Sequence, residues 1–153
     1  MKKDVLDFIT PLTAEFEGFS SKVYKCPAGF DTIGYGRNIE ANPLSKEEKA
    51  KLVNGEVSKE VAKEWLEAEL SRCYDACNNA FAWFKDLDTK RAGAIVDMAY
   101  NMGIGTLKTF KNSLAFMALQ EYDKAAENFR KSRWFSQVKR RGVRITEIIE
   151  KGE

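Results

Sequence analysis

Only one short part of the chain, residues 22–39, is rich in the residue types that form β-strands. Its β-branched and aromatic residues lie on both sides of a turn that contains proline and glycine, which predicts a hairpin with strands at 22–25 and 32–35. Because the periodic patterns elsewhere are helical, the predicted fold class is α+β, mostly helical, with a small hairpin or sheet near the N-terminus.

Helical patterns flank this hairpin. Residues 3–17 repeat apolar side chains at helical spacing and are followed by Gly18, a common helix terminator. Pro11 interrupts the pattern and Thr10 is a suitable cap, so a kink or a restart of the helix is expected there. The residues SKEE at 45–48 form a capping box, which predicts a further short helix.

The longest predicted helix spans 58–80, with an apolar stripe at steps of three and four residues. Four shorter helices are expected after it, at residues 91–102, 110–119, 123–130 and 142–149. We therefore expect a single domain over residues 1–153 with two lobes. The β-containing lobe covers about 18–57, helix 58–80 links the lobes, and the helical lobe covers about 81–153 and packs with the N-terminal helix. A cleft between lobes is a common ligand site.

The chain has three cysteines and no histidine. The lack of histidine excludes Ser-His and Cys-His nucleophile pairs and most zinc sites. Cys73 and Cys77 lie in the apolar stripe of the long helix, where small core residues are a better interpretation than a metal pair. No metal site is therefore predicted. The odd cysteine count, without paired spacing, indicates synthesis in a reducing compartment.

A net charge of +2 gives no reason to expect a nucleic-acid partner. The apolar stretch near the N-terminus is too short and too acidic for a signal peptide or an anchor, so we expect neither export nor stable membrane insertion. Basic residues nevertheless gather in the last quarter: Arg130, Lys131, Arg133, Lys139, Arg140, Arg141 and Arg144. This cluster is either a solvated helix face or a patch that attracts an anionic polymer.

Three polar side chains with chemical uses lie around the predicted hairpin, namely Glu17, Cys26 and Thr32. Glu17 is at the end of the first helix, where partial cover by the hairpin would raise the pKa of its carboxyl group, as a general acid requires. Glu15 lies roughly 200° around the helix, so only one of the two glutamates can face the hairpin. An exposed Glu17 without a chemical role is the alternative.

Cys26 and Thr32 are six residues apart across the turn, so a hairpin can bring them to the same place. Glycoside hydrolysis needs an acid and a second group that positions water or stabilises the developing positive charge. Cys26 can fill the second role as a thiolate, or as a polar partner for a water held by Thr32. A small buried residue is the alternative for Cys26. Asp31 is expected to face solvent, because adjacent strand residues point to opposite faces.

These residues resemble a known family. Glu17, Cys26 and Thr32 match the Glu-x8-Asp/Cys-x5-Thr catalytic motif of the phage-type lysozymes, glycoside hydrolase family 24, and the neighbouring EG, AG and TIGYG fit its surrounding pattern. The segments RAGAIVDMAYNMG, TFKNSL, DKAAENF and KSRWFSQ resemble successive blocks of the T-even phage lysozymes. The resemblance covers nearly the whole chain and implies a two-lobed, lysozyme-like fold.

The resemblance implies roles for individual residues. Glu17 corresponds to the general acid, Cys26 to the usual water-activating or stabilising aspartate, and Thr32 to the residue that holds the nucleophilic water. Arg141 matches the arginine that pairs with the catalytic glutamate. Positions that line the glycan cleft correspond to Asn38, Tyr100, Ser113 and Asn128. The implied reaction is cofactor-free hydrolysis of the β-1,4 bond between N-acetylmuramic acid and N-acetylglucosamine in peptidoglycan, an anionic polymer that the basic cluster would attract.

The sequence departs from the family pattern at two positions. Cys26 stands where the T-even enzymes have aspartate, which leaves the site open to oxidation. Arg37 stands where many relatives have histidine, a change expected to affect stability more than turnover.

The implied protein is a monomeric endolysin that lyses the host cell at the end of infection. It would accumulate in the host cytoplasm and reach the cell wall through a membrane lesion made by a separate holin-type protein. Two other functions fit the same residues: a lytic transglycosylase, which uses a glutamate but releases 1,6-anhydro products, and a peptidoglycan-binding module without activity.

Overall fold

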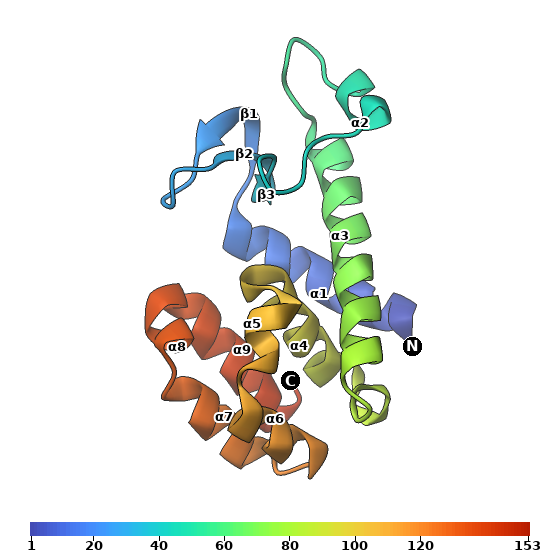
Figure 1. Ribbon diagram of the computed structural model, residues 1–153. Helices are drawn as coiled ribbons and strands as arrows, with labels where there is room; N and C mark the ends of the chain where they lie inside the picture. Colours follow the sequence, from blue (N-terminus) through green and yellow to red (C-terminus); the bar gives the residue numbers. More distant parts are fainter. The chain divides into compact units, whose positions relative to one another are not determined.

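The computed structural model describes residues 1–153 and contains nine α-helices, a 3-10 helix and three β-strands (Figure 1). The strands are β1 (Ser20–Lys25), β2 (Asp31–Gly34) and β3 (Arg37–Asn38). The helices are α1 (Lys2–Glu17), α2 (Lys46–Ala50), α3 (Lys59–Ala80), α4 (Thr89–Met102), α5 (Ile104–Lys108), α6 (Lys111–Ala118), α7 (Tyr122–Arg130), α8 (Arg133–Val138) and α9 (Arg140–Lys151). The short η1 covers Phe84–Asp86. This confirms the predicted α+β, lysozyme-like fold class.

The chain divides into two compact units by its internal contacts. Unit 1 comprises Met1–Ile9 and Leu70–Glu153, and unit 2 comprises Thr10–Glu69. The boundaries fall inside α1 and α3, so each of these helices contributes to both units. The single domain with lobe limits at 57 and 81 stays a prediction.

Unit 2 contains the antiparallel sheet, in the order β1-β2-β3 (Figure 1). The register pairs Tyr24 with Thr32 and Lys25 with Asp31, and an irregularity follows between Ser20 and Tyr24. The predicted hairpin is therefore confirmed. β3 was not predicted, because two residues carry no detectable alternation.

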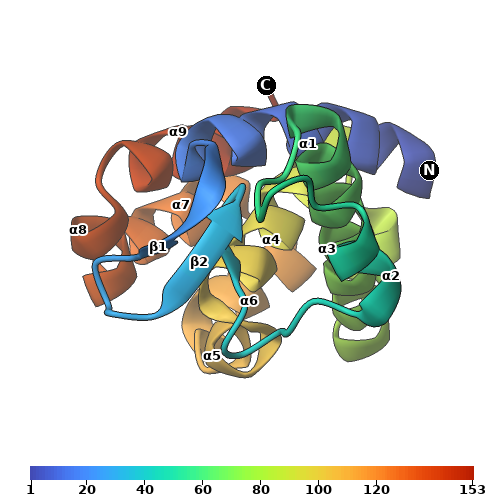
Figure 2. The same ribbon diagram turned by 90° about the horizontal axis from the view of Figure 1, so that it is seen from above.

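The core of unit 2 forms under this sheet. Ile33 of β2 packs with Val57 and with Ala62 and Trp65 of α3, and all four are buried. Phe19 and Tyr35 cover the edge of this cluster, with their ring centroids 5.3 Å apart. The sheet is thus held from one side by α3 while its β1–β2 hairpin extends outward (Figure 2).

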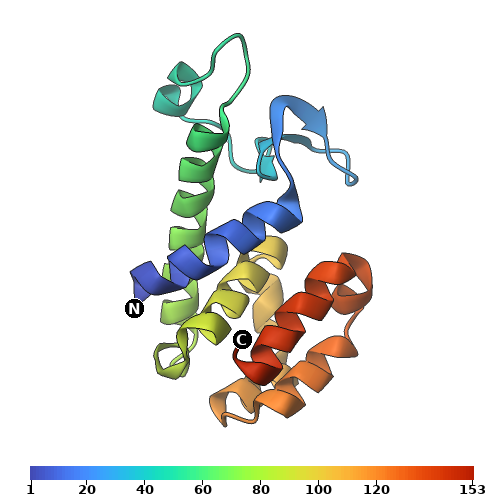
Figure 3. The same ribbon diagram turned by 180° about the vertical axis from the view of Figure 1, so that it is seen from behind.

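The core of unit 1 lies among α4, α7 and α9. The middle of α4, from Ala92 to Ala99, is buried throughout. Phe129 of α7 and Ile145 and Ile148 of α9 are fully buried beside it, and Figure 3 shows α7 running next to α9. α5 and α8 were not predicted because helices of five and six residues are too short to show a period.

α1 is one helix with Pro11 inside it, so the expected restart at Thr10 is wrong. Proline removes a single N–H donor, and Ile9 and Thr13 on either side of it are completely buried, which keeps the helix continuous. The hydroxyl of Thr10 does not cap a helix; it is buried without a hydrogen-bond partner.

The two cysteines of α3 differ in burial. Cys77 is fully buried, and burial raises the pKa of its thiol to about 12. Cys73 is half-buried, and neither thiol is part of a disulfide. The prediction of small core residues is therefore confirmed for Cys77 and only partly for Cys73. No helix of the protein has the length and apolar character needed to span a membrane.

Candidate active site

Glu17 is the last residue of α1. The helix ends there because Gly18 takes a left-handed conformation, with φ of 71°, and its N–H donates to the carbonyl of Ala14 at 3.0 Å. Glu17 is half-buried, whereas Glu15 is exposed. Of the two glutamates near the end of the helix, Glu17 is therefore the one whose carboxyl group is partly covered.

Gly36 lies directly against the Glu17 carboxyl group. It sits in the turn between β2 and β3 with φ of 73°, and a Cβ atom at this position would overlap the Oε1 and Cδ atoms of Glu17. Tyr35 packs on Phe19, which fixes this turn beside the end of α1. Only glycine fits both the left-handed backbone and the close approach.

Cys26 begins the five-residue loop of the hairpin. Its N–H donates to the carbonyl of Phe30 at 2.9 Å, and its own carbonyl accepts from the N–H of Gly29 at 2.7 Å. Pro27 occupies the second position of this turn, which favours the required φ, and Gly29 has φ of 89°. The loop sequence thus fixes the backbone on both sides of the thiol.

Hydrogen-bond donors converge on the Cys26 sulfur. The backbone N–H of Phe30, then those of Ala28 and Gly29 together with the Thr32 hydroxyl, hold the pKa of the Cys26 thiol below its usual value, against an opposing effect of desolvation. Such donors favour the thiolate. The hairpin therefore brings Cys26 and Thr32 together, as the spacing predicted.

Thr32 is buried, at 3% exposure, and its Oγ1 donates to the carbonyl of Phe30 at 2.9 Å. Its neighbour Asp31 points the other way, because Asp31 forms a surface ion pair of 2.8 Å with Lys25. This confirms the expected facing of Asp31, whose carboxylate lies on the opposite side of the hairpin from Thr32.

Arg37, the first residue of β3, is buried at 6% exposure among carboxylates and carbonyls. Its guanidinium forms a two-pronged ion pair with Glu48, lies 3.5 Å from Glu69, and donates to the carbonyls of Asn42 and Pro43. Hydrogen bonds from Arg37 lower the pKa of Glu48 to about 2. Arg37 thereby ties the loop after β3 to α2 and α3.

Asn38, predicted to line a glycan cleft, has a local structural role. Its Oδ1 accepts from the backbone N–H groups of Glu40 and Ala41, each at 3.0 Å. It lies opposite Thr32 in the sheet. Its amide N–H groups have no partner within the protein, so a sugar oxygen could use them.

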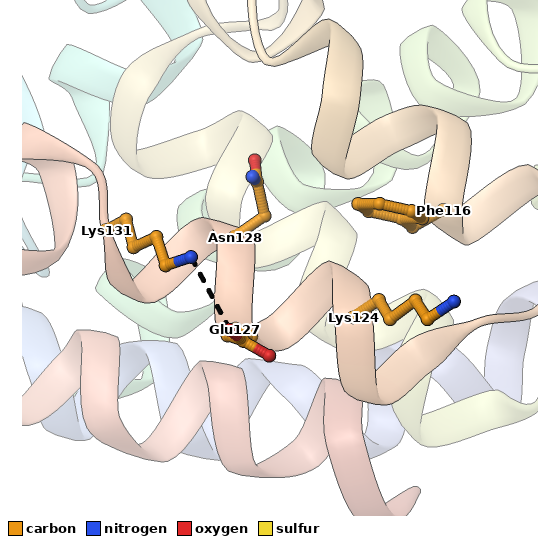
Figure 4. Close-up of a pocket in the computed structure, with 5 residues that line it drawn as sticks. All are labelled: Phe116, Lys124, Glu127, Asn128 and Lys131. Atoms are coloured by element: carbon orange, nitrogen blue, oxygen red, sulfur yellow. Dashed lines mark ion pairs between the residues drawn. The ribbon is translucent and has the colours of Figure 1, made fainter.

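Ser113 and Asn128 are brought together in unit 1. The Ser113 hydroxyl donates to Oδ1 of Asn128 at 2.6 Å, and Ser113 is 1% exposed. Asn128 also lines a pocket with Phe116, Lys124, Glu127 and Lys131 (Figure 4). Lys131 and Glu127 form an ion pair of 3.4 Å there. Tyr100, the other predicted glycan contact in unit 1, is half-buried near the end of α4.

Arg141 is buried in unit 1 and holds Asp97. Its Nη2 and Nε donate to the two carboxylate oxygens of Asp97 at 2.8 and 3.1 Å, and Asp97 has no exposed surface. A buried aspartate on α4 was not considered as a partner from the sequence, since it lies inside an apolar run. The pairing of Arg141 with Glu17 stays a prediction.

Several members of the basic cluster have carboxylate partners. Arg130 pairs with Glu150, Lys131 with Glu127, Arg141 with Asp97 and Arg144 with Glu147. The three others, Arg133, Lys139 and Arg140, are exposed. These carboxylates neutralise part of the positive charge, so the basic cluster has a lower net charge than the sequence alone indicated.

The sequence is similar to known proteins over most of its length. Residues 14–147 match the sequence model of the phage lysozyme family. The chain belongs to the phage lysozyme family. At the level of the family, the activity is a lysozyme-like hydrolysis of peptidoglycan.

Among curated proteins, the chain is similar to two from Dictyostelium discoideum. "Probable T4-type lysozyme 1" is 29% identical over 152 residues, and "Probable T4-type lysozyme 2" is 26% identical over 153. Each alignment covers 89% of both chains. The pre-baseplate central spike protein Gp5 of Enterobacteria phage T4 is 29% identical over 151 residues, but the alignment covers only 26% of that protein.

The sequence did not predict two features of the site. Gly36 was noted only as part of a motif, and its contact with Glu17 required the structure. The carboxylates that hold Arg37 lie 11 and 32 residues away in the chain, and no local pattern connects them.

Proposed function

We propose that the protein is a muramidase that hydrolyses the β-1,4 bond between N-acetylmuramic acid and N-acetylglucosamine and acts as an endolysin. One observation carries this proposal. Cys26 and Thr32 lie together on the hairpin, and the Glu17 carboxyl group lies against the next turn of the same sheet. Glycoside hydrolysis requires an acid and a second group that positions water or stabilises the developing positive charge, and we assign Glu17 to the first role and Cys26 with Thr32 to the second.

Glu17 is proposed as the general acid that protonates the leaving-group oxygen. It lies at the C-terminal end of α1, whose last turn contains no basic residue. Its side chain is half-buried at this position, beside the hairpin turn that carries Gly36. Contact with Gly36 fixes the direction of the carboxyl group.

Cys26 is proposed to take the place of the second carboxylate. As a thiolate it can accept a proton from the attacking water, and the same negative charge stabilises the developing oxocarbenium ion. The Thr32 hydroxyl has one proton, which can be donated to the Phe30 carbonyl or to the Cys26 thiolate, and in either case its oxygen lone pairs remain available to accept a hydrogen bond from that water. The water oxygen then bonds to the anomeric carbon as the glycosidic bond breaks toward Glu17.

Around this centre we propose that Asn38, Tyr100, Ser113 and Asn128 contact the glycan and that Arg141 supports Glu17. The exposed Arg133, Lys139 and Arg140 would attract the anionic polymer at long range. We also propose that the enzyme works as a monomer and reaches the wall from the host cytoplasm after a holin-type protein opens the membrane.

The products of digestion test this proposal. Purified peptidoglycan is incubated with the protein, and the released fragments are analysed by mass spectrometry. Hydrolysis gives reducing ends that carry the added water, whereas a lytic transglycosylase gives 1,6-anhydro ends that are 18 mass units lighter. Predominantly anhydro ends would contradict the hydrolase assignment.

A turbidity assay on permeabilised Gram-negative cells separates an enzyme from a binding module. The protein should clear the suspension, since cleavage of the wall releases the cell contents. Intact, unpermeabilised cells serve as the control for holin dependence and should keep their turbidity. A protein that binds the wall but leaves turbidity and fragment release unchanged would exclude the enzymatic function.

A further inference from the structure

Tyr24 lies on the same face of the hairpin as Thr32. The two residues are direct partners in the β1–β2 register, and side chains of directly paired residues lie on one face. The next pair, Lys25 and Asp31, forms its ion pair on the opposite face, which fixes the alternation. The phenol ring of Tyr24 is therefore on the side of the hairpin that carries Thr32.

The Tyr24 hydroxyl is within electrostatic reach of both Glu17 and Cys26. Partial burial raises the pKa of the phenol, and the negative charges of Glu17 and Cys26 raise it further. Glu17 is 7 residues before Tyr24 on another element, so their proximity is a result of the fold and not of chain neighbourhood. At neutral pH the hydroxyl keeps its proton and can donate it in a hydrogen bond.

This proton has no partner within the protein. The hydroxyl forms no hydrogen bond with another residue, and Tyr24 is 38% exposed. The neighbouring groups differ in this respect, because the Thr32 proton is donated to Phe30 or Cys26 and a Cys26 thiolate has no proton. Besides the acid itself, the Tyr24 hydroxyl is thus a hydrogen-bond donor on the site's side of the hairpin. Its proton forms no hydrogen bond within the protein.

We propose that Tyr24 is a substrate-contacting residue whose hydroxyl donates a hydrogen bond to an oxygen of the sugar bound between Glu17 and Cys26. This inference rests on the proposed function and adds a residue to its site. The ring contributes an apolar surface beside the sugar, and the hydroxyl fixes the sugar in position as the bond to the leaving group is broken.

The variant Tyr24→Phe tests this role, because it keeps the ring and removes only the hydroxyl. We expect kcat/KM on soluble peptidoglycan fragments to fall about three- to tenfold, the effect of one hydrogen bond to substrate. The melting temperature should stay at the native value, because the hydroxyl has no partner in the fold. Unchanged kcat/KM would overturn the proposal. A fall in kcat/KM that is fully accounted for by a lower melting temperature would also overturn it.

Tyr122→Phe is the matched control. Its hydroxyl also forms no hydrogen bond within the protein, and its ring packs on Arg91 in unit 1. This variant should keep native kcat/KM and native stability. Glu17→Gln is assayed in parallel: if it clears cells at the native rate, the proposed function fails, whereas an inactive Glu17→Gln with a fully active Tyr24→Phe contradicts the Tyr24 proposal alone.

NMR of 13Cζ-labelled tyrosine gives a readout that does not depend on turnover. In the Glu17→Gln variant, the pKa of Tyr24 should fall because one negative charge is removed, while that of Tyr122 should not move. Addition of a peptidoglycan tetrasaccharide to this inactive variant should shift the Tyr24 signal and leave the Tyr122 signal in place. A Tyr24 signal that does not respond to the saccharide would overturn the proposal.

Discussion

The two edges of β2 have opposite characters. Its hairpin edge, formed by β1 and the loop 26–30, is open: Tyr24 and Phe30 are 38% and 45% exposed, and the Tyr24 hydroxyl has no partner. Its arginine edge, formed by Arg37 of β3 and the partners of that side chain, is saturated with hydrogen bonds and ion pairs. The Tyr24 hydroxyl, which we propose to contact the substrate, is left unsatisfied, whereas the Arg37 guanidinium, which holds the fold, is not.

This contrast predicts that substitutions on the hairpin edge change the rate and that substitutions on the arginine edge change the free energy of unfolding. The two quantities can be measured separately, by turbidity clearance and by thermal or urea unfolding. Each of the following variants tests whether the rate and the free energy of unfolding change independently.

Glu17→Gln should have the largest effect. The amide cannot donate the proton that the leaving group needs, so the rate of lysis should fall by about 10³-fold or more. The melting temperature should change little, because glutamine has nearly the same shape. Glu15→Gln is the matched control, since this glutamate lies on the same helix and is exposed, and it should retain full activity. Native lysis by Glu17→Gln would exclude Glu17 as the acid.

Arg37→Met should destabilise the protein by about 3 kcal/mol, because it leaves Glu48 and Glu69 charged without their cation. Urea unfolding measures the loss, and kcat at a temperature where the variant is folded should stay within about twofold of native. Lys51→Met is the control. It removes an ion pair with Glu64 in which both side chains are more than half exposed, and should cost about 0.5 kcal/mol or less.

The pH dependence of unfolding gives a second measure of the arginine edge. The folded-state pKa of Glu48 is about 2, below its ordinary value of 4.5. Its stabilising contribution is therefore present above pH 4.5 and is lost as the pH falls from there toward 2. Arg37→Met should lose less stability across this range than the native protein. An equal loss in both would contradict the role given to this pair.

Cys26→Ser should reduce activity about 100-fold without a change in stability, because a serine hydroxyl does not ionise at neutral pH. Cys26→Asp should keep much of the activity. A base works in its ionised form, so activity rises as the pH increases through its pKa. The acidic limb of the pH–activity profile should therefore move to lower pH in Cys26→Asp, whose carboxyl group ionises near pH 4. Native activity in Cys26→Ser would contradict this assignment.

Gly36→Ala should change both the rate and the free energy of unfolding. Gly36 lies in the turn that leads to β3 and also contacts the carboxyl group of Glu17. The added methyl group would displace the Glu17 carboxyl group and force alanine into a left-handed conformation. We expect a rate loss of about tenfold and a destabilisation of about 1–2 kcal/mol. Gly55→Ala is matched in backbone, with φ of 77° and open space around the position, and should lose stability only. Equal activity in the two variants would show that the Glu17 contact is unimportant.

Local patterns were enough to predict much of the fold. The apolar stripe predicted α3, the capping box predicted the start of α2 with its reciprocal Ser45 and Glu48 hydrogen bonds, and the strand formers predicted the hairpin. For α1 a kink or a restart was predicted at Pro11 because proline is a strong local signal, and the restart was wrong because the residues on both sides of Pro11 are buried in one continuous helix.

The spacing of Cys26 and Thr32 also predicted their proximity, since a hairpin is a local structure. The contact of Gly36 with Glu17, the carboxylates around Arg37 and the Asp97 partner of Arg141 could not be predicted. Each joins residues from separate elements, and a single sequence contains no record of which distant side chains meet.

Unit 1 is interrupted in sequence, because the chain leaves it at Ile9 and returns at Leu70. During synthesis, residues 10–69 therefore emerge completely before unit 1 can begin to close. Val5 and Ile9, both fully buried, must wait for partners at least 60 positions further along. Bringing Val5 and Ile9 to these partners costs the entropy of closing a loop of that length. The entropy cost falls if unit 2 has already folded and so shortened the distance between residues 10 and 69. The segment that carries the candidate active site would then also be the first part of the newborn chain able to fold.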